Sequence, residues 1–298
     1  MSLDEANPPP PSLGPGVVDP LLRRALEEDV GKGDVTSDAL IPAARRACGR
    51  LIAKEPGIAC GLGVFARVFT LLDPGAAVHA LVEDGAEVRP GERLVEVTGR
   101  ARSLLAGERT ALNLVQRMSG IATLTHAFVR AAGTGVRVFD TRKTTPGLRV
   151  LEKYAVRCGG AENHRFGLHD EAMIKNNHVD LAGSTLAALV GRLRQALGPD
   201  LVIHAEARDE VEAFAAVQGG ADVVLLDNMS PAALRELCPR LRALAGPEGR
   251  PVAIEASGGV TLDRVAEIAA SGVDRISVGA LTHSAPSLDL SFRIEALP

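Results

Sequence analysis

The chain has 298 residues, of which 46% are hydrophobic, 23% charged and only 3% aromatic. This apolar content excludes a disordered chain, and the length allows one large domain or two of medium size. The formal net charge is −4, with 33 basic and 37 acidic residues, and aromatic rings for base stacking are scarce. These features disfavour a nucleic-acid partner.

The N-terminal segment and the cysteines indicate the cellular compartment of the protein. The segment MSLDEANPPPPSLGPG is acidic and rich in proline, unlike a signal peptide, and no apolar run is long enough for a membrane helix. The four cysteines form no C-x-x-C pair and have no zinc-site spacing, as is typical of free thiols in a reducing compartment. We therefore expect a soluble, cytoplasmic protein with no membrane contact.

The first half of the chain predicts a small α+β module. Residues 1–16 are expected to form a disordered arm, because four consecutive prolines favour extended backbone. Apolar residues then recur at helical spacing over residues 17–29. Residues 47–99 alternate short β-like runs with turn pairs, and a helix is predicted among them over 63–72. A long helix is predicted over residues 103–132.

The second half alternates short apolar strands with helical segments. The predicted strands are VRVFDT, AMIK, LVIHAE, DVVLLD, VAIEAS and DRISVG, and helical spacing follows over residues 209–217, 231–244 and 262–271. This alternation implies parallel strands with right-handed crossovers, and continuously apolar strands are buried on both faces. Six such units that close on themselves make a TIM-like α/β barrel.

Polar residues end each of these strands, at the face of a barrel where active sites are built. The strand-end groups are Thr141-Arg142-Lys143, Lys175, Glu206, Asp227-Asn228, Ser257-Gly258-Gly259 and Gly279. Helix capping alone does not explain six such groups of mixed chemistry.

Residues 137–178 carry eight basic and five acidic side chains within an acidic chain, which favours an anion-binding site. Arg142, Lys143, His164, Arg165 and Lys175 fall outside the predicted helices and fit this interpretation best. Lysine is scarce, so the position of two of only five lysines at strand ends is informative. Three other cations are better explained as a solvated helix face, since they follow at i, i+4 and i+8: Arg149, Lys153 and Arg157.

The remaining strand ends suggest a metal and a phosphate. Glu206 and Asp227 could hold Mg²⁺ together with substrate phosphates, could accept hydrogen bonds from a ribose, or could cap the next helices. The two glycine turns before the last two helices, Ser257-Gly258-Gly259 and Gly279-Ala280, favour a phosphate site, although glycine is also a plain turn residue. No H-x-H or H-E-x-x-H occurs, so a metal hydrolase is disfavoured. His79, His126 and His204 are expected to be structural or surface residues.

Seven segments in order resemble one family. They are EEDVGKGDVTSDAL, GERTALNLVQRMSGIAT, DTRKTTPGLRVLEKYAVRCGGAENHR, MIKNNHVDLAG, VVLLDNMSP, IEASGGVTLD and ISVGALTHSAPSLDLS. They are similar to the quinolinate phosphoribosyltransferases and cover nearly everything except the Pro-rich arm. The resemblance implies an N-terminal α/β sandwich domain over residues 17–117, an open TIM-like α/β barrel over 118–285, and a C-terminal segment, 286–298, that packs back on the sandwich.

The resemblance also implies a reaction and its site. Quinolinate and 5-phosphoribosyl 1-pyrophosphate become nicotinate mononucleotide, pyrophosphate and CO₂, with Mg²⁺, in de novo NAD synthesis. The protein would be a homodimer or larger, with sites shared across the interface. The resemblance implies that quinolinate is bound by Thr141, Arg142, His164, Arg165 and the neighbouring subunit's Arg109. It implies catalysis by Lys143 and Lys175, which would lie between the substrates, and contacts of Glu206 and Asp227 with the ribose and Mg²⁺. Phosphate binding is implied for Ser257, Gly258, Gly259, Gly279 and Ala280.

Two residues depart from the family pattern. Asn176 follows Lys175 where the family often has an acidic residue, and His204 replaces the first Glu of a V-E-V-E strand. Two alternatives therefore stay open: a related barrel phosphoribosyltransferase with another acceptor, and a non-catalytic ligand-binding relative. Retention of four residues together favours a dicarboxylate acceptor: Arg109, Arg142, His164 and Arg165.

Overall fold

The computed structural model of the protein describes residues 13–245 and 251–297. The chain divides into two units. The sandwich unit comprises Met1–His126, Thr144–Gly160 and Ser284–Pro298, and the barrel unit comprises Ala127–Lys143 and Ala161–His283. Most of the arm predicted over residues 1–16 lies outside the described residues, and its last two residues, Pro15 and Gly16, begin a helix.

The sandwich unit is built on an antiparallel sheet with the strand order β12-β1-β5-β3. Its strands are β1 (Arg46–Ala53), β3 (Ala77–Ala80), β5 (Arg93–Arg100) and β12 (Leu290–Ala296), and a separate ladder pairs β2 (Gly57–Ile58) with β4 (Glu87–Val88). Alternate residues of β1 are buried, as expected for a strand that covers a core with one face. The C-terminal strand β12 pairs with β1, with Phe292 opposite Leu51.

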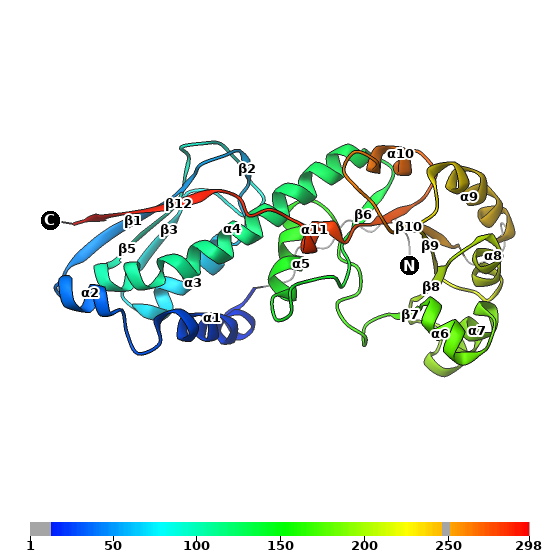
Figure 1. The fold of residues 1–298 in the computed structure, drawn as a ribbon, viewed down its shortest axis with the longest axis horizontal. Coiled ribbons are helices and arrows are strands. Elements are labelled where there is room, and N and C mark those ends of the chain that lie inside the picture. The colour runs from blue at the N-terminus through cyan, green and yellow to red at the C-terminus, as the bar shows by residue number, and fades with distance from the viewer. Residues whose placement is uncertain (1–12, 246–250, 298) are drawn as a thin grey trace. The chain divides into compact units, whose positions relative to one another are not determined.

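Two helices, α3 and α4, lie along this sheet (Figure 1), and three more belong to the same unit. They are α1 (Pro15–Val30), α2 (Val35–Leu40), α3 (Leu62–Leu72), α4 (Ala101–Ala132) and α5 (Arg149–Cys158). The helices predicted over residues 17–29, 63–72 and 103–132 are confirmed, with small differences at their ends. The predicted boundary between residues 117 and 118 falls inside α4, which runs without interruption across it.

The core of the sandwich unit concentrates the few aromatic rings of the chain. Phe65 and Phe69 on α3 and Phe292 on β12 lie with ring centroids 5.1–5.3 Å apart. Gly49 on β1 makes room for them, because a Cβ there would lie 2.0 Å from the Phe292 ring. Aliphatic side chains fill the rest of this core.

The barrel unit has six parallel strands in the order β6-β11-β10-β9-β8-β7. They are β6 (Arg137–Phe139), β7 (Ala172–Ile174), β8 (Ile203–Ala207), β9 (Val223–Asp227), β10 (Ala253–Ser257) and β11 (Arg275–Ser277). All six strands predicted from the sequence are confirmed. The ladder ends at β6 and β7, with a single bridge from Phe139 to Glu162 beyond β6, so the TIM-like barrel is open there.

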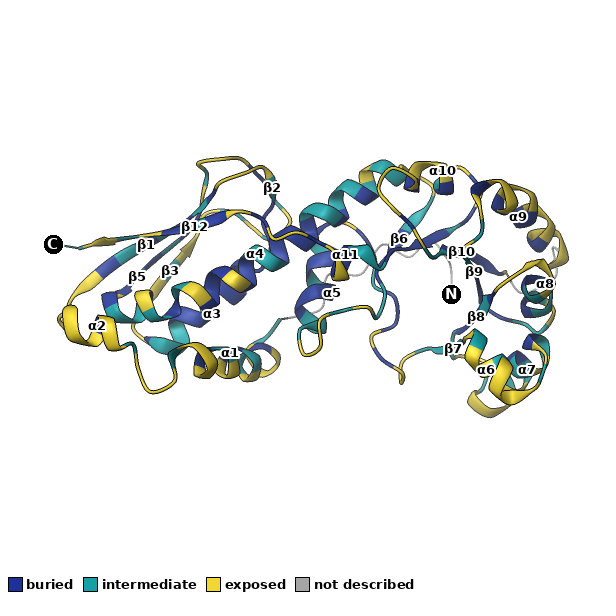
Figure 2. Cartoon of the chain, in the orientation of Figure 1, coloured by how far each residue is buried: buried dark blue, intermediate teal, exposed yellow. Residues whose placement is uncertain are grey.

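Helices follow these strands on the outer side of the sheet (Figure 1). They are α6 (Asn176–Ala182), α7 (Leu186–Leu197), α8 (Glu210–Gln218), α9 (Pro231–Ala245), α10 (Val265–Ala269) and α11 (Ala280–His283). The strands are buried, while α8 and α9 expose one face to solvent (Figure 2). The helix predicted over residues 262–271 is shorter than expected. In the part of the chain that the structure describes, no helix has the length and hydropathy needed to cross a membrane.

One expectation about surface charge is wrong. Lys153 was expected on a solvated face of its helix, but it is 1% exposed. Helical spacing places Lys153 on the same face as Arg149 and Arg157, yet periodicity alone does not say whether that face meets solvent. The neighbouring Glu152 is buried as well and accepts two hydrogen bonds from Arg117.

Two glycines in helix interiors provide a matched test of packing. A Cβ at Gly120 of α4 would lie 1.9 Å from the Pro286 carbonyl oxygen, whereas a Cβ at Gly191 of α7 meets nothing within 4 Å. We expect Gly120→Ala to destabilise the fold by about 2 kcal/mol through overpacking, and Gly191→Ala to stabilise it by up to about 1 kcal/mol through helix propensity. Urea unfolding followed by circular dichroism measures both. Equal stability of the two variants would contradict the packing.

Candidate active site

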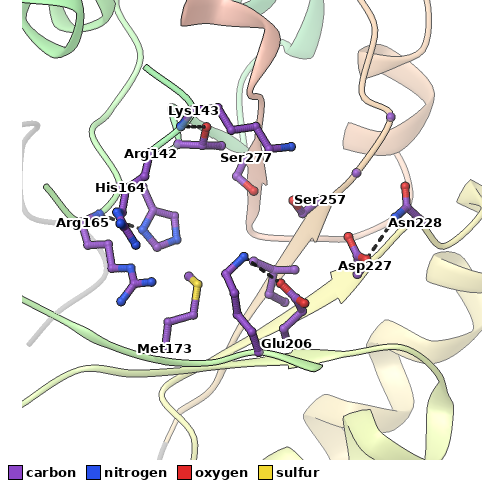
Figure 3. A pocket seen from close by; sticks show the side chains of 15 residues that line it. Arg142, Lys143, His164, Arg165, Met173, Glu206, Asp227, Asn228, Ser257 and Ser277 are labelled. Atoms are coloured by element: carbon purple, nitrogen blue, oxygen red, sulfur yellow. Dashed lines mark hydrogen bonds and ion pairs between the residues drawn. The ribbon is translucent and has the colours of Figure 1, made fainter. Parts of the chain in front are cut away.

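A cavity of about 520 Å³ lies at the carboxyl ends of the barrel strands, within the size range of small-molecule sites. Figure 3 shows Arg142, His164 and Arg165 on one side of it and Asp227, Asn228 and Ser257 on the other. The residues that line it are Thr141, Arg142, Lys143, His164, Arg165, Met173, Lys175, Glu206, Leu225, Asp227, Asn228, Ser257, Gly258, Gly259 and Ser277. The structure thus brings together most of the residues selected from the sequence.

Asp140 joins the two basic segments of the site. It follows β6 directly and is fully buried. Its carboxylate accepts hydrogen bonds from the backbone N–H of His164 at 2.8 Å and from the Asn163 side chain at 2.7 Å. The segment with His164 and Arg165 is thereby fixed beside the strand that leads to Arg142. Sequence reasoning missed this role of Asp140, although its position between a strand and a basic triplet was visible.

Two guanidinium groups face the same side of the cavity. Arg165 is 8% exposed and donates to the Glu171 carbonyl oxygen at 3.1 Å. Burial and the positive charge of Arg142 both lower the pKa of Arg165 from its usual value. Neighbouring cations that repel each other in a partly buried pocket are stabilised by a bound anion, and the arginine fork suits carboxylates.

The two strand-end lysines differ in their partners. Lys175 Nζ lies 3.2 Å from Glu206 Oε2, so its charge is already paired. Lys143 makes no ion pair with any described residue. Its backbone is fixed by two hydrogen bonds, from its N–H to Thr141 Oγ1 and from Thr282 Oγ1 to its carbonyl oxygen. Its ammonium group is therefore available to a substrate.

Glu206 and Asp227 end the adjacent strands β8 and β9 and line the same cavity. Glu206 accepts from Lys175, and Asp227 Oδ2 accepts from the Asn228 amide at 3.0 Å. Two carboxylates supply hard oxygen ligands, and Mg²⁺ often uses one or two of these together with waters and substrate phosphates. The donor set therefore fits Mg²⁺ as a partner of a phosphorylated ligand.

The turn after β10 brings main chain to the cavity. Gly258 and Gly259 have φ values of +87° and +57°, which side chains rarely adopt. A Cβ at Gly258 would lie 2.3 Å from Asn228 Oδ1. Asn228 itself is the only described non-glycine residue with positive φ, at 55°. Such a crowded turn of two glycines needs residues without side chains, and a phosphate group would meet backbone there.

Three predicted residues do not line the cavity. Arg109 lies exposed on α4 in the sandwich unit. Gly279 instead makes room for Lys143, because a Cβ there would lie 2.9 Å from Lys143 Cδ, and Ala280 begins α11. Sequence reasoning missed three lining residues, Met173, Leu225 and Ser277, and it named Asn228 only as a strand-end residue without a role. Asn228 follows Asp227 at a strand end, and that position was the available signal.

The pocket of this α/β barrel has cations on one side, and carboxylates and a glycine turn on the other. This arrangement defines the class of barrel enzymes that act on phosphorylated, anionic substrates. Two family models match the chain: "Quinolinate phosphoribosyl transferase, N-terminal domain" over residues 34–119, and "Quinolinate phosphoribosyl transferase, C-terminal domain" over residues 121–293. The chain belongs to the quinolinate phosphoribosyl transferase family.

Named relatives agree with this membership. A probable carboxylating nicotinate-nucleotide pyrophosphorylase from Synechocystis is 44% identical over 99% of both chains. The protein of the same name from Bacillus subtilis is 42% identical over 92% of both chains. The crystal structure of NadC from Streptococcus pyogenes superposes with a TM-score of 0.89 at 39% identity, over 97% of this chain and 100% of that chain. The predicted fold, an α/β barrel with an N-terminal sheet domain, is thereby confirmed.

Proposed function

We propose that the protein converts quinolinate and 5-phosphoribosyl 1-pyrophosphate to nicotinate mononucleotide, pyrophosphate and CO₂, as its relatives' names indicate. The observation that carries the proposal is the division of the cavity in Figure 3. Arg142, His164 and Arg165 form an acceptor side, while Asp227 and Ser257 belong to the side suited to a phosphorylated sugar.

The acceptor side suits a dianion. Quinolinate carries two carboxylates on adjacent ring carbons, and Arg142 and Arg165 can each meet one through a bidentate contact. His164 and Thr141 contribute further polar groups to this side. Nicotinate has a single carboxylate, so it would engage only one of the two guanidinium groups. The site should therefore discriminate strongly between the two acceptors.

The opposite side suits the sugar phosphates. The turn Ser257-Gly258-Gly259 would take the 5′-phosphate, and Glu206 and Asp227 would contact the ribose hydroxyls and hold Mg²⁺. When bound, Mg²⁺ would neutralise charge on the pyrophosphate. Lys143, which makes no ion pair with a described residue, supports the same leaving group from its position between the two sides.

The chemistry then needs positioning and electrostatics. The ring nitrogen attacks the anomeric carbon, the bond to pyrophosphate breaks, and negative charge grows on the leaving group beside Lys143. Once the nitrogen is quaternary, the neighbouring carboxylate leaves as CO₂, and its electron pair stays on the ring carbon next to the cationic nitrogen. Protonation of that carbon gives nicotinate mononucleotide, and no covalent enzyme intermediate is required.

The direct experiment measures CO₂ and pyrophosphate release from quinolinate, with nicotinate as the matched acceptor. We expect both products from quinolinate in equal amounts and only with Mg²⁺ present. Pyrophosphate release from nicotinate without CO₂ would overturn the assignment in favour of a non-decarboxylating relative. The absence of turnover with either acceptor, despite ligand binding, would favour a non-catalytic role.

Sites shared between subunits of a homodimer are part of the proposal, with Arg109 as the contributed residue. Its exposure on α4, in a different unit from the cavity-lining residues, supports this assignment. We expect Arg109→Ala and Lys175→Ala proteins to be nearly inactive alone. After subunit exchange, random mixing should give about a quarter of wild-type activity, since each heterodimer would hold one intact site. Failure of mixed subunits to recover activity would argue against a site built across the interface.

A cytoplasmic location also belongs to the proposal. Cys60 and Cys158 are free thiols, although their sulfur atoms lie within 4.8 Å of each other. Thiols so close are oxidised readily in an oxidising compartment, so the proposal places them in a reducing one.

A further inference from the structure

A cluster of ionisable side chains lies next to the acceptor side and has no part in the chemistry described above. His204 on β8 and Glu255 on β10 are 0% exposed, and Arg275 on β11 is 9% exposed. Glu171, which precedes β7, lies beside them. Taking charges out of water costs several kcal/mol for each ion unless they are well paired. A buried cluster of this kind calls for a specific role.

His164 lies between two carboxylates of this cluster. Its Nδ1 is 3.7 Å from Glu171 Oε2, and its Nε2 is 3.6 Å from Glu255 Oε1. Nδ1 also accepts a hydrogen bond from the backbone N–H of Arg165 at 2.7 Å. Rotation of the imidazole ring would break these contacts, so the cluster determines where the ring stands in the cavity.

Glu171 contacts both His164 and Arg165, the two adjacent residues predicted to bind the acceptor. Its side chain approaches His164, and its carbonyl oxygen accepts from the Arg165 guanidinium at 3.1 Å. Burial acts to raise the pKa of Glu171, but the close contact with His204 and the charges of His164, His204 and Arg275 lower it below its usual value. The carboxylate is therefore an ionised acceptor.

His204 holds that carboxylate in place. Its Nε2 lies 3.0 Å from Glu171 Oε2, and its ring packs on the ring of His164 with centroids 4.6 Å apart. On the other side, Arg275 fixes Glu255 at 3.1 Å and stacks on Phe139 at 3.9 Å from the ring centroid. Both carboxylates that flank His164 thus have their own cationic or hydrogen-bonding partner.

We propose that Glu171 and His204 are positioning residues that hold His164 and Arg165 in the geometry for binding the acceptor dicarboxylate. This inference rests on the proposed function. Neither residue lines the cavity, and their contacts with the site run to His164 and Arg165, so their loss should affect the acceptor and spare the other substrate.

The test compares Glu171→Gln and His204→Gln with wild type. Each disrupts the 3.0 Å contact between the His204 ring and the Glu171 carboxylate, so we expect the KM and the calorimetric Kd for quinolinate to rise about tenfold. The KM for 5-phosphoribosyl 1-pyrophosphate should change less than about twofold. Glu267→Gln is the control, because Glu267 forms only an exposed ion pair with Arg235. It should match wild type in all three constants.

A double variant that exchanges the two residues, Glu171→His with His204→Glu, tests whether the contact can be rescued. It restores an imidazole–carboxylate contact at the same place and should recover most of the quinolinate affinity. Equal loss of affinity for both substrates, or an unchanged Kd for quinolinate in folded Glu171→Gln protein, would overturn the proposal. Glu171 is 31% exposed, so this variant is expected to fold even if changes at the fully buried His204 prevent folding.

The experiment distinguishes failure of the positioning role from failure of the proposed function. If wild-type protein binds quinolinate by calorimetry but releases no CO₂, the reaction is wrong, and the affinities of the variants still test the positioning role. If wild-type protein does not bind quinolinate at all, the proposed function and this inference both fall. Thermal unfolding of each variant reports any loss of stability independently of these affinities.

Discussion

Replacing Lys143 with alanine is expected to lower kcat about 10²- to 10³-fold, the effect of removing one preorganised group that stabilises transition-state charge. Lys143 is the strand-end lysine whose ammonium group pairs with no described residue, while Lys175 is paired with Glu206. The backbone of Lys143 is held at both its N–H and its carbonyl oxygen, so the variant should fold normally. Steady-state turnover with saturating substrates measures the change.

The choice of control matters for this prediction. Lys153 is nearly fully buried, and its replacement would disturb packing. Lys54 is exposed, and only its backbone N–H is bonded, to the Asp289 carbonyl oxygen. Lys54→Ala should retain wild-type turnover and stability. Comparable turnover of the Lys143 and Lys54 variants would remove Lys143 from the mechanism.

The path of the Lys143 side chain provides a second variant that tests the role of its ammonium group. Its stem passes over Gly279, where no Cβ fits without displacing it. Gly279→Ala should therefore lower kcat in the same direction as Lys143→Ala, although less, because the ammonium group is displaced and not removed. This gives Gly279 a steric role, while the phosphate contact suggested by the sequence stays a prediction.

The candidate site was predictable from the sequence because topology does most of the assembly. Residues such as Lys175, Glu206 and Asp227 lie far apart along the chain, but each lies at the carboxyl end of a parallel strand. The carboxyl ends of parallel strands meet at one face of a barrel, so strand recognition suffices to bring them together. The same argument places Ser257 opposite the basic segments.

Other features were not predictable, for identifiable reasons. His204 lies within a strand, where a single histidine has no sequence partner, and its contact with Glu171 exists only across strands β7 and β8. The burial of Lys153 depends on which helix face meets the core, which spacing does not determine. The left-handed conformation of Asn228 is imposed by the crowded turn beside it.

The second large effect is expected at that turn. Gly258→Ala should lower kcat/KM for 5-phosphoribosyl 1-pyrophosphate about 10²-fold while leaving the KM for quinolinate nearly unchanged. A side chain at φ +87° costs about 1–2 kcal/mol, and its Cβ would lie 2.3 Å from Asn228 Oδ1. Displacing the turn would also weaken a charge-assisted phosphate contact worth about 1.5–3 kcal/mol.

Gly220 separates these two contributions. Its φ of +85° is nearly the same as that of Gly258, but a Cβ there would meet nothing within 4 Å, and it lies before β9, at the opposite end of the strands from the cavity. Gly220→Ala therefore carries the backbone strain alone and should lower the unfolding free energy without changing either KM. If Gly258→Ala behaved like Gly220→Ala in both stability and kinetics, the turn after β10 would not bind the phosphoribosyl group. A selective loss for that substrate requires the turn to contact it, because backbone strain by itself does not distinguish between two ligands.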